Sequence, residues 1–140
     1  MDDLILRDFV DADFVSLYKL WASTCVGNPA RGDSLASIQK TLAAGGRLLV
    51  LAAGDLIVGS CWLTDDGRRL YVHHMAVLPE MQDRGLGRRL LEKAVAIAAE
   101  RDLQMKLEVA ADNERAIHLY RKLGFDFIGD YEVMLKRSIG

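Results

Sequence analysis

The chain has 140 residues, 51% of them hydrophobic and 27% charged, which is typical of a globular protein and favours a single domain over residues 1–140. Its formal net charge of −2 gives no general attraction to nucleic acid or to an anionic membrane, so neither is expected as a partner. No apolar run reaches the roughly 20 residues that cross a bilayer, and the acidic start "MDDLILRDF" lacks the basic region of a signal peptide, so we expect a cytoplasmic protein.

The first third of the chain predicts a strand and two helices. A short strand over residues 4–7 is followed by a helix that Asp11 caps. After a loop over residues 27–32, Ser34 caps a second helix, which ends at the glycine pair 45–46. The apolar faces of these helices contain Phe14, Leu17, Tyr18 and Trp21 in the first and Leu35, Ile38 and Leu42 in the second.

The middle of the chain predicts three strands joined by tight turns. Residues 47–53 and 56–64 form two strands around the turn at Gly54 and Asp55, and the sequence "DDG" turns into a third strand over 69–78. Pro79 helps to end that strand because it has no backbone N–H. These hairpin connections predict antiparallel pairing among the three strands.

A long helix from about Gly85 to Arg101 follows, and then a strand over residues 105–110. Because a helix joins the strands 69–78 and 105–110, they should pair in parallel with a right-handed crossover. Asp112 or Asn113 caps a last helix that stops at Gly124. Residues 130–136 should form a closing strand, paired with a short one near Phe127. The fold class is α/β (α+β), with a mixed, mostly antiparallel sheet and helices on both faces.

The segment "QDRGLG", residues 82–87, lies where a strand gives way to a helix. Free N–H groups at a helix start attract anions, and Gly85 and Gly87 remove the Cβ atoms that would block a close approach. Arg84 and Arg88 add positive charge suited to phosphate oxygens. The spacing matches neither the dinucleotide fingerprint nor the phosphate loop of nucleotide hydrolases. A tight turn with no ligand remains the structural alternative.

Two segments together resemble the GNAT acetyltransferase superfamily, namely "MAVLPEMQDRGLGRRLL" and "LEVAADNERAIHLYRKLGF". The first carries the acyl-CoA motif of the family as Gln82, Gly85 and Gly87. The resemblance implies the GNAT-like sheet, with a central parallel strand pair that splays apart. It also implies transfer of an acetyl group from acetyl-CoA to a primary amine by direct attack in a ternary complex. The second segment matches the family at Asn113, Ala116, Leu119, Tyr120, Lys122, Gly124 and Phe125.

The resemblance also implies where acetyl-CoA binds. The pantetheine arm should bond to the backbone of Met75, Ala76 and Val77, where the parallel strands separate. Asn113 should contact the arm as well as cap its helix, and Tyr120 should also lie at the cofactor. The diphosphate should bind the backbone N–H groups of Gln82, Asp83, Arg84, Gly85, Leu86, Gly87 and Arg88.

The resemblance makes Tyr120 the acid that protonates the departing thiolate, a task that a phenol with a pKa near 10 can perform. For the base that accepts the proton of the amine, Glu108, His73 and a water chain are left open. Neighbouring residues on a strand point to opposite faces, so His73 and His74 are not expected to share a task. No metal site is expected. Cys25 and Cys61 lack metal-ligand spacing and are expected as buried free thiols.

The acceptor is expected to be a small-molecule amine, because no segment resembles a peptide-binding insertion. A protein N-terminus or a lysine is the alternative acceptor, and a non-catalytic sensor of acyl-CoA is the alternative from another class. The pocket for the amine should involve Tyr18, Trp21, the loop 25–33 and the turn 127–131. A homodimer is a candidate assembly on the resemblance alone.

Overall fold

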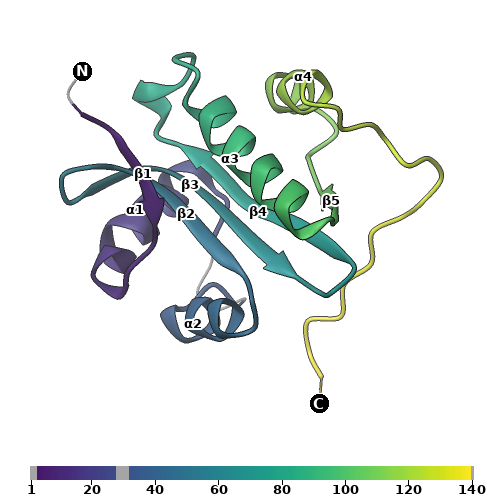
Figure 1. Cartoon of the computed structure of the whole chain (residues 1–140), viewed down its shortest axis with the longest axis horizontal. Helices are drawn as coiled ribbons and strands as arrows, with labels where there is room; N and C mark the ends of the chain where they lie inside the picture. Colours follow the sequence, from purple (N-terminus) through teal and green to yellow (C-terminus); the bar gives the residue numbers. More distant parts are fainter. Residues whose placement is uncertain (1–2, 28–31, 140) are drawn as a thin grey trace. The chain divides into compact units, whose positions relative to one another are not determined.

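A computed structural model of the protein describes residues 3–27 and 32–139 (Figure 1). Within these ranges the chain divides into two compact units after Glu108, and each unit is described by itself. Residues 28–31 of the predicted loop 27–32 lie outside the described residues. No helix in the described ranges is long and apolar enough to cross a membrane.

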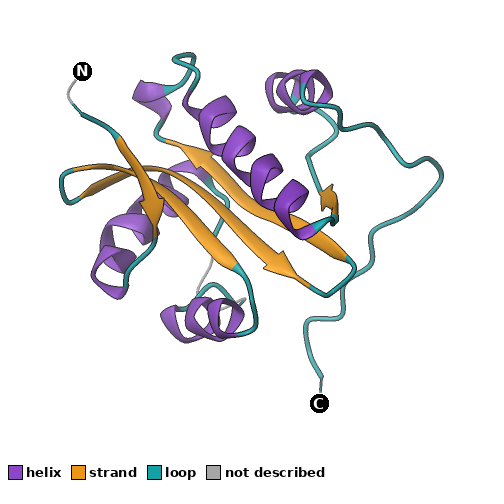
Figure 2. Ribbon diagram, viewed as in Figure 1, coloured by secondary structure: helices purple, strands orange, loops and turns teal. Residues whose placement is uncertain are grey.

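The first unit is built on a five-stranded sheet with the strand order β1-β2-β3-β4-β5 (Figure 2). Its strands are β1 (Ile5–Asp8), β2 (Arg47–Ala53), β3 (Leu56–Asp65), β4 (Arg69–Val77) and β5 (Gln104–Leu107). Its helices are α1 (Phe14–Thr24), α2 (Leu35–Ala43) and α3 (Leu86–Arg101), with short 3-10 turns η1 (Asp11–Asp13) and η3 (Pro79–Met81).

The pairing of the strands confirms the predicted mixed sheet. The pairs β1–β2, β2–β3 and β3–β4 are antiparallel, and the pair β4–β5, which α3 connects, is parallel. Gly54, with φ of 61°, provides the left-handed residue that the tight turn between β2 and β3 requires. Among the described residues, β5 is the last strand of this sheet, so the parallel pair lies at one edge of it and not at its centre.

Helices cover both faces of the sheet, as predicted. On one face, α1 and α2 bury Leu17, Trp21 and Ile38 in a cluster with Leu48 and Val50 of β2. On the other face, Leu90 of α3 approaches Gly59 of β3, whose absent side chain leaves room beside Leu51. The buried run in β2 therefore reflects a strand covered on both sides, which is why its sequence is continuously apolar.

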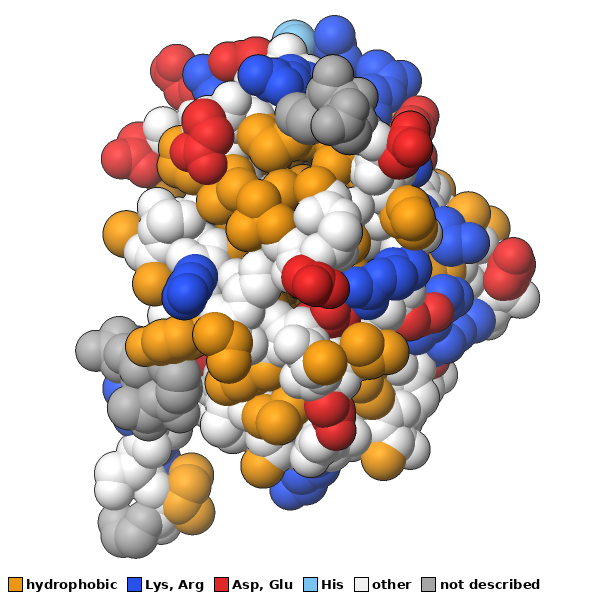
Figure 3. Space-filling model, turned by 90° about the vertical axis from the view of Figure 1, so that its left-hand side faces the viewer, with side chains coloured by type: hydrophobic (Ala, Val, Ile, Leu, Met, Phe, Trp, Pro, Cys, Tyr) orange, Lys and Arg blue, Asp and Glu red, His pale blue; other side chains and the backbone are white. Residues whose placement is uncertain are grey.

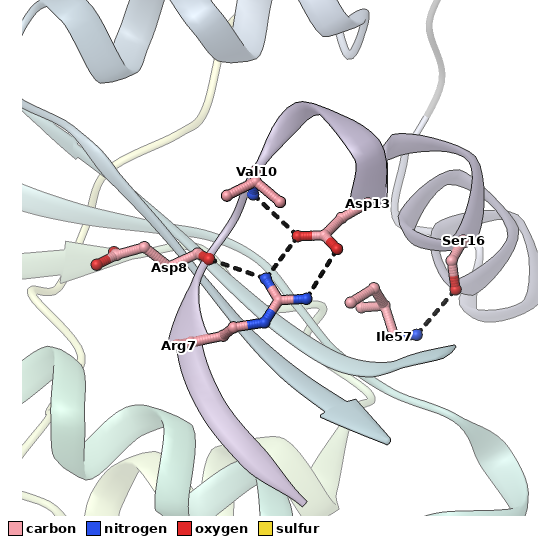
Figure 4. Close-up of polar contacts among 6 residues, drawn as sticks. All are labelled: Arg7, Asp8, Val10, Asp13, Ser16 and Ile57. Carbon is pink, nitrogen blue, oxygen red and sulfur yellow. Dashed lines mark hydrogen bonds and ion pairs between the residues drawn. The ribbon is translucent and has the colours of Figure 1, made fainter. Parts of the chain in front are cut away.

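The start of α1 differs from the prediction (Figure 4). Asp11 lies in the 3-10 turn η1, and its carboxylate accepts a hydrogen bond from Gln39, so it does not cap α1. The buried Asp13 instead accepts two hydrogen bonds from the Arg7 guanidinium, at 2.7 and 2.9 Å, and one from the backbone N–H of Val10. These hydrogen bonds tie the end of β1 to the entry of α1.

The second unit contains α4 (Glu114–Lys122). Asn113 caps it as predicted, with its Oδ1 accepting from the backbone N–H of Ala116 at 3.2 Å, and Gly124 follows its end with φ of 95°. The predicted strands over 130–136 and near Phe127 are wrong, because residues 125–139 form no strand (Figure 2). A strand needs a partner for its backbone groups, and this segment has no ladder in the described chain. Its apolar side chains are correspondingly exposed, among them Phe127, Ile128, Tyr131, Val133, Met134 and Leu135.

Candidate active site

The parallel pair opens along β4. Its pairing with β5 ends at Val72 and Leu107, while β4 continues to Val77. On the other side, β4 remains paired with β3, where Ala76 faces Ser60 and Val77 faces Gly59. The side of residues 73–77 turned away from β3 therefore has no strand partner within the described residues. Backbone groups exposed in this way can receive an extended ligand as an added strand.

A β-bulge lies at the beginning of this unpaired stretch. His73 pairs with Trp62 and Ala76 pairs with Ser60, so two residues of β4 oppose one residue of β3. The extra residue places His74 in the left-handed region, with φ of 46°. A side chain other than glycine is strained there and needs support from its surroundings.

Buried side chains supply that support. The Ser60 hydroxyl donates to the carbonyl oxygen of His74 at 2.8 Å and accepts from the indole N–H of Trp21 at 2.9 Å. Ser60 and Trp21 are both fully buried. The bulge is thereby held from α1 through β3 by a continuous hydrogen-bonded chain.

The bulge also brings the two neighbouring histidines to one face. The rings of His73 and His74 lie 6.2 and 5.4 Å from the Trp62 ring, between centroids. The prediction that they point to opposite faces is therefore wrong, because strand alternation holds only without an inserted residue.

His73 and His74 have different partners. The Nε2 atom of His73 lies 2.8 Å from the Thr64 hydroxyl. Burial, with a smaller contribution from His74, lowers the pKa of His73 below 6.5, although the charges of Glu108 and Asp33 act to raise it. The Nε2 atom of His74 lies 2.7 Å from a carboxylate oxygen of Asp33, and both side chains are largely buried.

The glycine turn opens α3. Gly85 is its N-cap, with φ of 78°, a conformation that a larger residue adopts only under strain. The N-cap residue Gly85 has no side chain to cap the first turn of α3, and N–H groups at the start of a helix attract anions. The side-chain amide of Gln82 donates to the carbonyl oxygen of Val77 at 3.2 Å, and Asp83 is also left-handed, with φ of 65°.

The arginines around the turn are mostly exposed. Arg84 has an exposed side chain and forms no ion pair among the described residues, whereas Arg88 lies 3.3 Å from Glu92. The positive end of α3 and Arg84 together favour a negatively charged ligand at this turn.

Glu108 does not lie within a strand, as the sequence predicted, but directly after β5 with its side chain exposed. Its charge nevertheless acts to raise the pKa of His73, against the larger lowering effect of burial, so these two predicted bases belong to one electrostatic environment. The predicted acid, Tyr120, lies on α4 in the second unit with Asn113. Its side chain is 8% exposed, and its ring centroid lies 5.9 Å from that of Phe125.

The two cysteines also differ from each other. Cys61 is buried in β3, and burial raises the pKa of its thiol to about 12, which keeps it protonated and unreactive at neutral pH. Cys25 is exposed just after α1, so the prediction that it is buried is wrong. The described residues contain no cluster of three or more His, Cys, Asp or Glu side chains that could hold a metal ion.

Sequence reasoning missed Asp33 and Ser60 as neighbours of the histidines. Asp33 precedes α2 and is 41 positions from His74, so no local pattern connects the two. The adjacent histidines in a strand with an unpaired side were the available signal, but the bulge that reorients them has no signature in the sequence.

A model described as the acetyltransferase (GNAT) family matches residues 14–125, which include the unpaired part of β4, the glycine turn and α4. The chain belongs to this family. N-alpha-acetyltransferase RimI of Mycobacterium tuberculosis is 38% identical over 81 residues, which are 55% of this chain and 50% of that protein. The mycothiol acetyltransferase of Kineococcus radiotolerans is 34% identical over 130 residues, which are 87% of this chain and 42% of that protein.

The chain thus spans about half, or less, of the length of these curated relatives. The crystal structure of an acetyltransferase from Trypanosoma brucei has the same fold, with a TM-score of 0.78 and 26% sequence identity. That comparison covers 96% of this chain and 99% of the other. The GNAT fold class predicted from the sequence is confirmed.

Proposed function

We propose that this GNAT protein, as a single domain, is an acetyl-CoA-dependent N-acetyltransferase that moves an acetyl group to a primary amine by direct attack in a ternary complex. The observation that carries the proposal is the combination of an unpaired side on β4 with a helix start that Gly85 opens. The unpaired side of β4 can hold an extended acyl carrier, and the start of α3 can hold its phosphates. Acetyl-CoA combines these two parts, an extended arm and a diphosphate.

Different residues of the first unit bind different parts of acetyl-CoA. The backbone of Met75, Ala76 and Val77 binds the pantetheine arm, and a backbone N–H in this stretch polarises the thioester carbonyl. The N–H groups of residues 82–88 bind the diphosphate, and Arg84 adds charge. In the second unit, Asn113 and Tyr120 are the residues that we assign to the cofactor.

The chemistry needs no covalent intermediate on the protein. Because Cys61 is buried and its pKa is raised to about 12, it is unsuited to attack the thioester, which favours direct attack by the amine. Tyr120 is the proposed acid for the thiolate. Glu108 and His73 are the groups that the sequence proposes for the proton of the amine, and their shared electrostatic environment supports placing that step near β4.

The proposed acceptor is a small-molecule amine. The match to a mycothiol acetyltransferase over most of this chain supports a small acceptor. Tyr18 is 40% exposed and available to an acceptor, but Trp21 is fully buried and cannot line a pocket as the sequence suggested. Figure 3 shows one face of the molecule on which hydrophobic side chains lie between acidic and basic ones. Large exposed hydrophobic side chains of the first unit include Ile5, Val10, Val15, Tyr18 and Leu56.

A protein N-terminus is the second candidate acceptor, because part of the chain matches an N-alpha-acetyltransferase. The exposed apolar side chains of residues 127–139 support a homodimer as the assembly, since such surfaces are commonly covered by another chain.

The test measures thiol release from acetyl-CoA with amino sugars, polyamines, amino acids and short peptides as acceptors. We expect release with at least one amine, and a kcat about a hundredfold lower in Tyr120→Phe if the phenol is the acid. In calorimetry, Gly85→Val should weaken acetyl-CoA binding at least about tenfold, because valine resists a φ of 78°. Binding of acetyl-CoA without release for any amine would favour a sensor, and no binding at all would reject the proposed function.

A further inference from the structure

The pair formed by His74 and Asp33 has no place in the reaction as assigned so far. Both residues belong to the first unit, and their side chains are only 20% and 15% exposed. His74 is also the strained residue of the bulge, so the chain maintains an unfavourable backbone conformation at the position that carries this imidazole. Such strain collects at functional sites because only a dense surrounding network can maintain it.

The contacts of His74 fix its orientation. Its ring meets the Trp21 ring edge-on at 4.7 Å and the Trp62 ring at 5.4 Å, between centroids. An ionised carboxylate only accepts hydrogen bonds, so the partner of Asp33, Nε2, carries the proton. In the neutral imidazole, Nδ1 is then the atom with a free electron pair. Within the described chain, no group bonds to this atom.

We propose that His74, oriented by Asp33, is the base that takes the proton of the acceptor amine. Nδ1 is the ring nitrogen nearer to the backbone, and the backbone here is the beginning of the unpaired stretch 73–77. This inference rests on the proposed function, which places the thioester along the same stretch. It assigns the removal of the amine proton to His74 in preference to Glu108 and His73.

The proposed reaction begins with loss of a proton from the acceptor and ends with protonation of the thiolate. The ammonium group of the acceptor gives one proton to Nδ1, and the imidazolium, stabilised by Asp33, returns it to water. The amine nitrogen then forms a bond to the carbonyl carbon, and the C–S bond breaks with its electron pair going to sulfur. The thiolate takes a proton from the proposed acid Tyr120, which recovers one from the nitrogen of the new amide. Asp33 acts through His74 and is a positioning residue.

Among the described residues, the charged and titratable groups that contact or adjoin His74 are Asp33 and His73. Asp33 comes from the segment before α2, and His73 from β4 itself, while α1 and β3 present Trp21 and Trp62. Glu108 and Asp33 influence His73 in turn. The pH dependence of kcat in a His74 variant therefore has to be compared with the pH dependence of kcat in His73→Gln and in Glu108→Gln.

The first test compares kinetics with the best amine of the panel. We expect His74→Gln to lower kcat about a hundredfold and Asp33→Asn about tenfold, with the KM for acetyl-CoA changed less than about twofold. The loss in His74→Gln should shrink toward alkaline pH, where the amine loses its proton without a base. The matched control is His118→Gln on α4, an exposed histidine with no assigned role, which should retain full activity.

Chemical rescue shows whether His74 acts as a base or only packs against its neighbours. Glycine readily adopts a φ of 46°, so His74→Gly should keep the bulge and leave a space for a small ring. Imidazole should restore at least about a tenth of the lost kcat, whereas pyrazole, with the same shape but far weaker basicity, should not.

Equal rescue by both rings, or activity within about threefold of wild type in His74→Gln, would overturn the assignment. So would a loss in Glu108→Gln that exceeds the loss in His74→Gln. If the wild-type protein releases no thiol with any amine, the proposed function fails and this inference fails with it.

Discussion

Strand β2 and the segment 130–136 are both rich in strand-forming residues, yet only β2 becomes a strand. β2 lies between β1 and β3 and is covered by helices on both faces, so its backbone groups and its side chains are satisfied together. In the segment 130–136, Tyr131, Val133 and Leu135 alternate as a strand requires, but they are 77%, 73% and 71% exposed. Alternation of apolar and polar residues thus favours a strand, but the strand forms only where a neighbouring strand offers free backbone groups.

Hydrogen exchange should show the largest difference between these two regions. We expect the backbone amides of β2 to exchange at least about a thousandfold more slowly than those of residues 130–136, because only the former are held in a ladder. Mass spectrometry of short peptides from both regions measures this. Slow exchange in 130–136 would contradict the comparison, and slowing that grows with protein concentration would show that a second copy supplies the missing strand.

A matched pair of leucine substitutions should separate the regions by stability. Leu48 is fully buried in β2, so Leu48→Ala should lower the free energy of unfolding by about 3 kcal/mol through lost contacts and a residual cavity. Leu135 is 71% exposed, and Leu135→Ala should change that free energy by less than about 0.5 kcal/mol. Urea unfolding followed by tryptophan fluorescence reports on the first unit, which holds both Trp21 and Trp62. A loss of more than about 1 kcal/mol in Leu135→Ala would mean that its side chain is buried in solution.

The two regions also mark how far the sequence predicts the fold. In the first unit, apolar patterns predict the five strands and the three helices, and tight turns predict the antiparallel pairing of β2, β3 and β4, because these strands follow one another directly in the chain. The sequence did not predict the pairing of β1 with β2, in which Ile5 lies opposite Ala52. The parallel partner of β4 is also recovered, since a helical connection dictates its direction. The failure at 130–136 has a different origin, because a strand far from its partner depends on contacts that alternation does not encode.

A buried ion pair should have the next largest effect. The Arg7 guanidinium, through its hydrogen bonds, is the main cause that holds the pKa of Asp13 below 3.8, so Asp13 contributes stability above about pH 4. That contribution is lost as pH falls through the lowered pKa of the folded state. Asp13→Asn should therefore lower the free energy of unfolding by about 2 kcal/mol at neutral pH, and by less at acidic pH. Urea unfolding at several pH values measures both.

The control for Asp13 is Asp8, which pairs with Arg47 at 3.0 Å with its side chain 56% exposed. Asp8→Asn should change the free energy of unfolding by less than about 1 kcal/mol, because water screens an exposed pair. Equal losses in the two variants would show that burial of Asp13 does not strengthen its pairing.

The candidate site shows a second limit of sequence reasoning. The glycine turn was predicted with its residues, because the need for bare backbone at a helix start restricts the sequence at Gly85. The surroundings of His74 were not predicted, because a bulge arises from the mismatch of two strands and leaves each sequence ordinary. Ser60 bonds to the backbone carbonyl of His74 and Asp33 to its ring, and His74 lies within the bulge.

The smallest expected effect separates two roles of Asn113 in the second unit. Asn113→Ala removes the cap of α4 and should destabilise this helix by about 1 kcal/mol, whereas Asn113→Asp keeps an oxygen that accepts from Ala116. If Asn113 also contacts acetyl-CoA, Asn113→Asp should bind it several-fold more weakly, because a carboxylate has no N–H to donate and repels phosphate. Thermal unfolding by circular dichroism and calorimetry with acetyl-CoA measure the two effects separately. Wild-type affinity for acetyl-CoA in Asn113→Asp would show that Asn113 caps α4 without contacting acetyl-CoA. The proposed binding residues would then be those of the first unit and Tyr120.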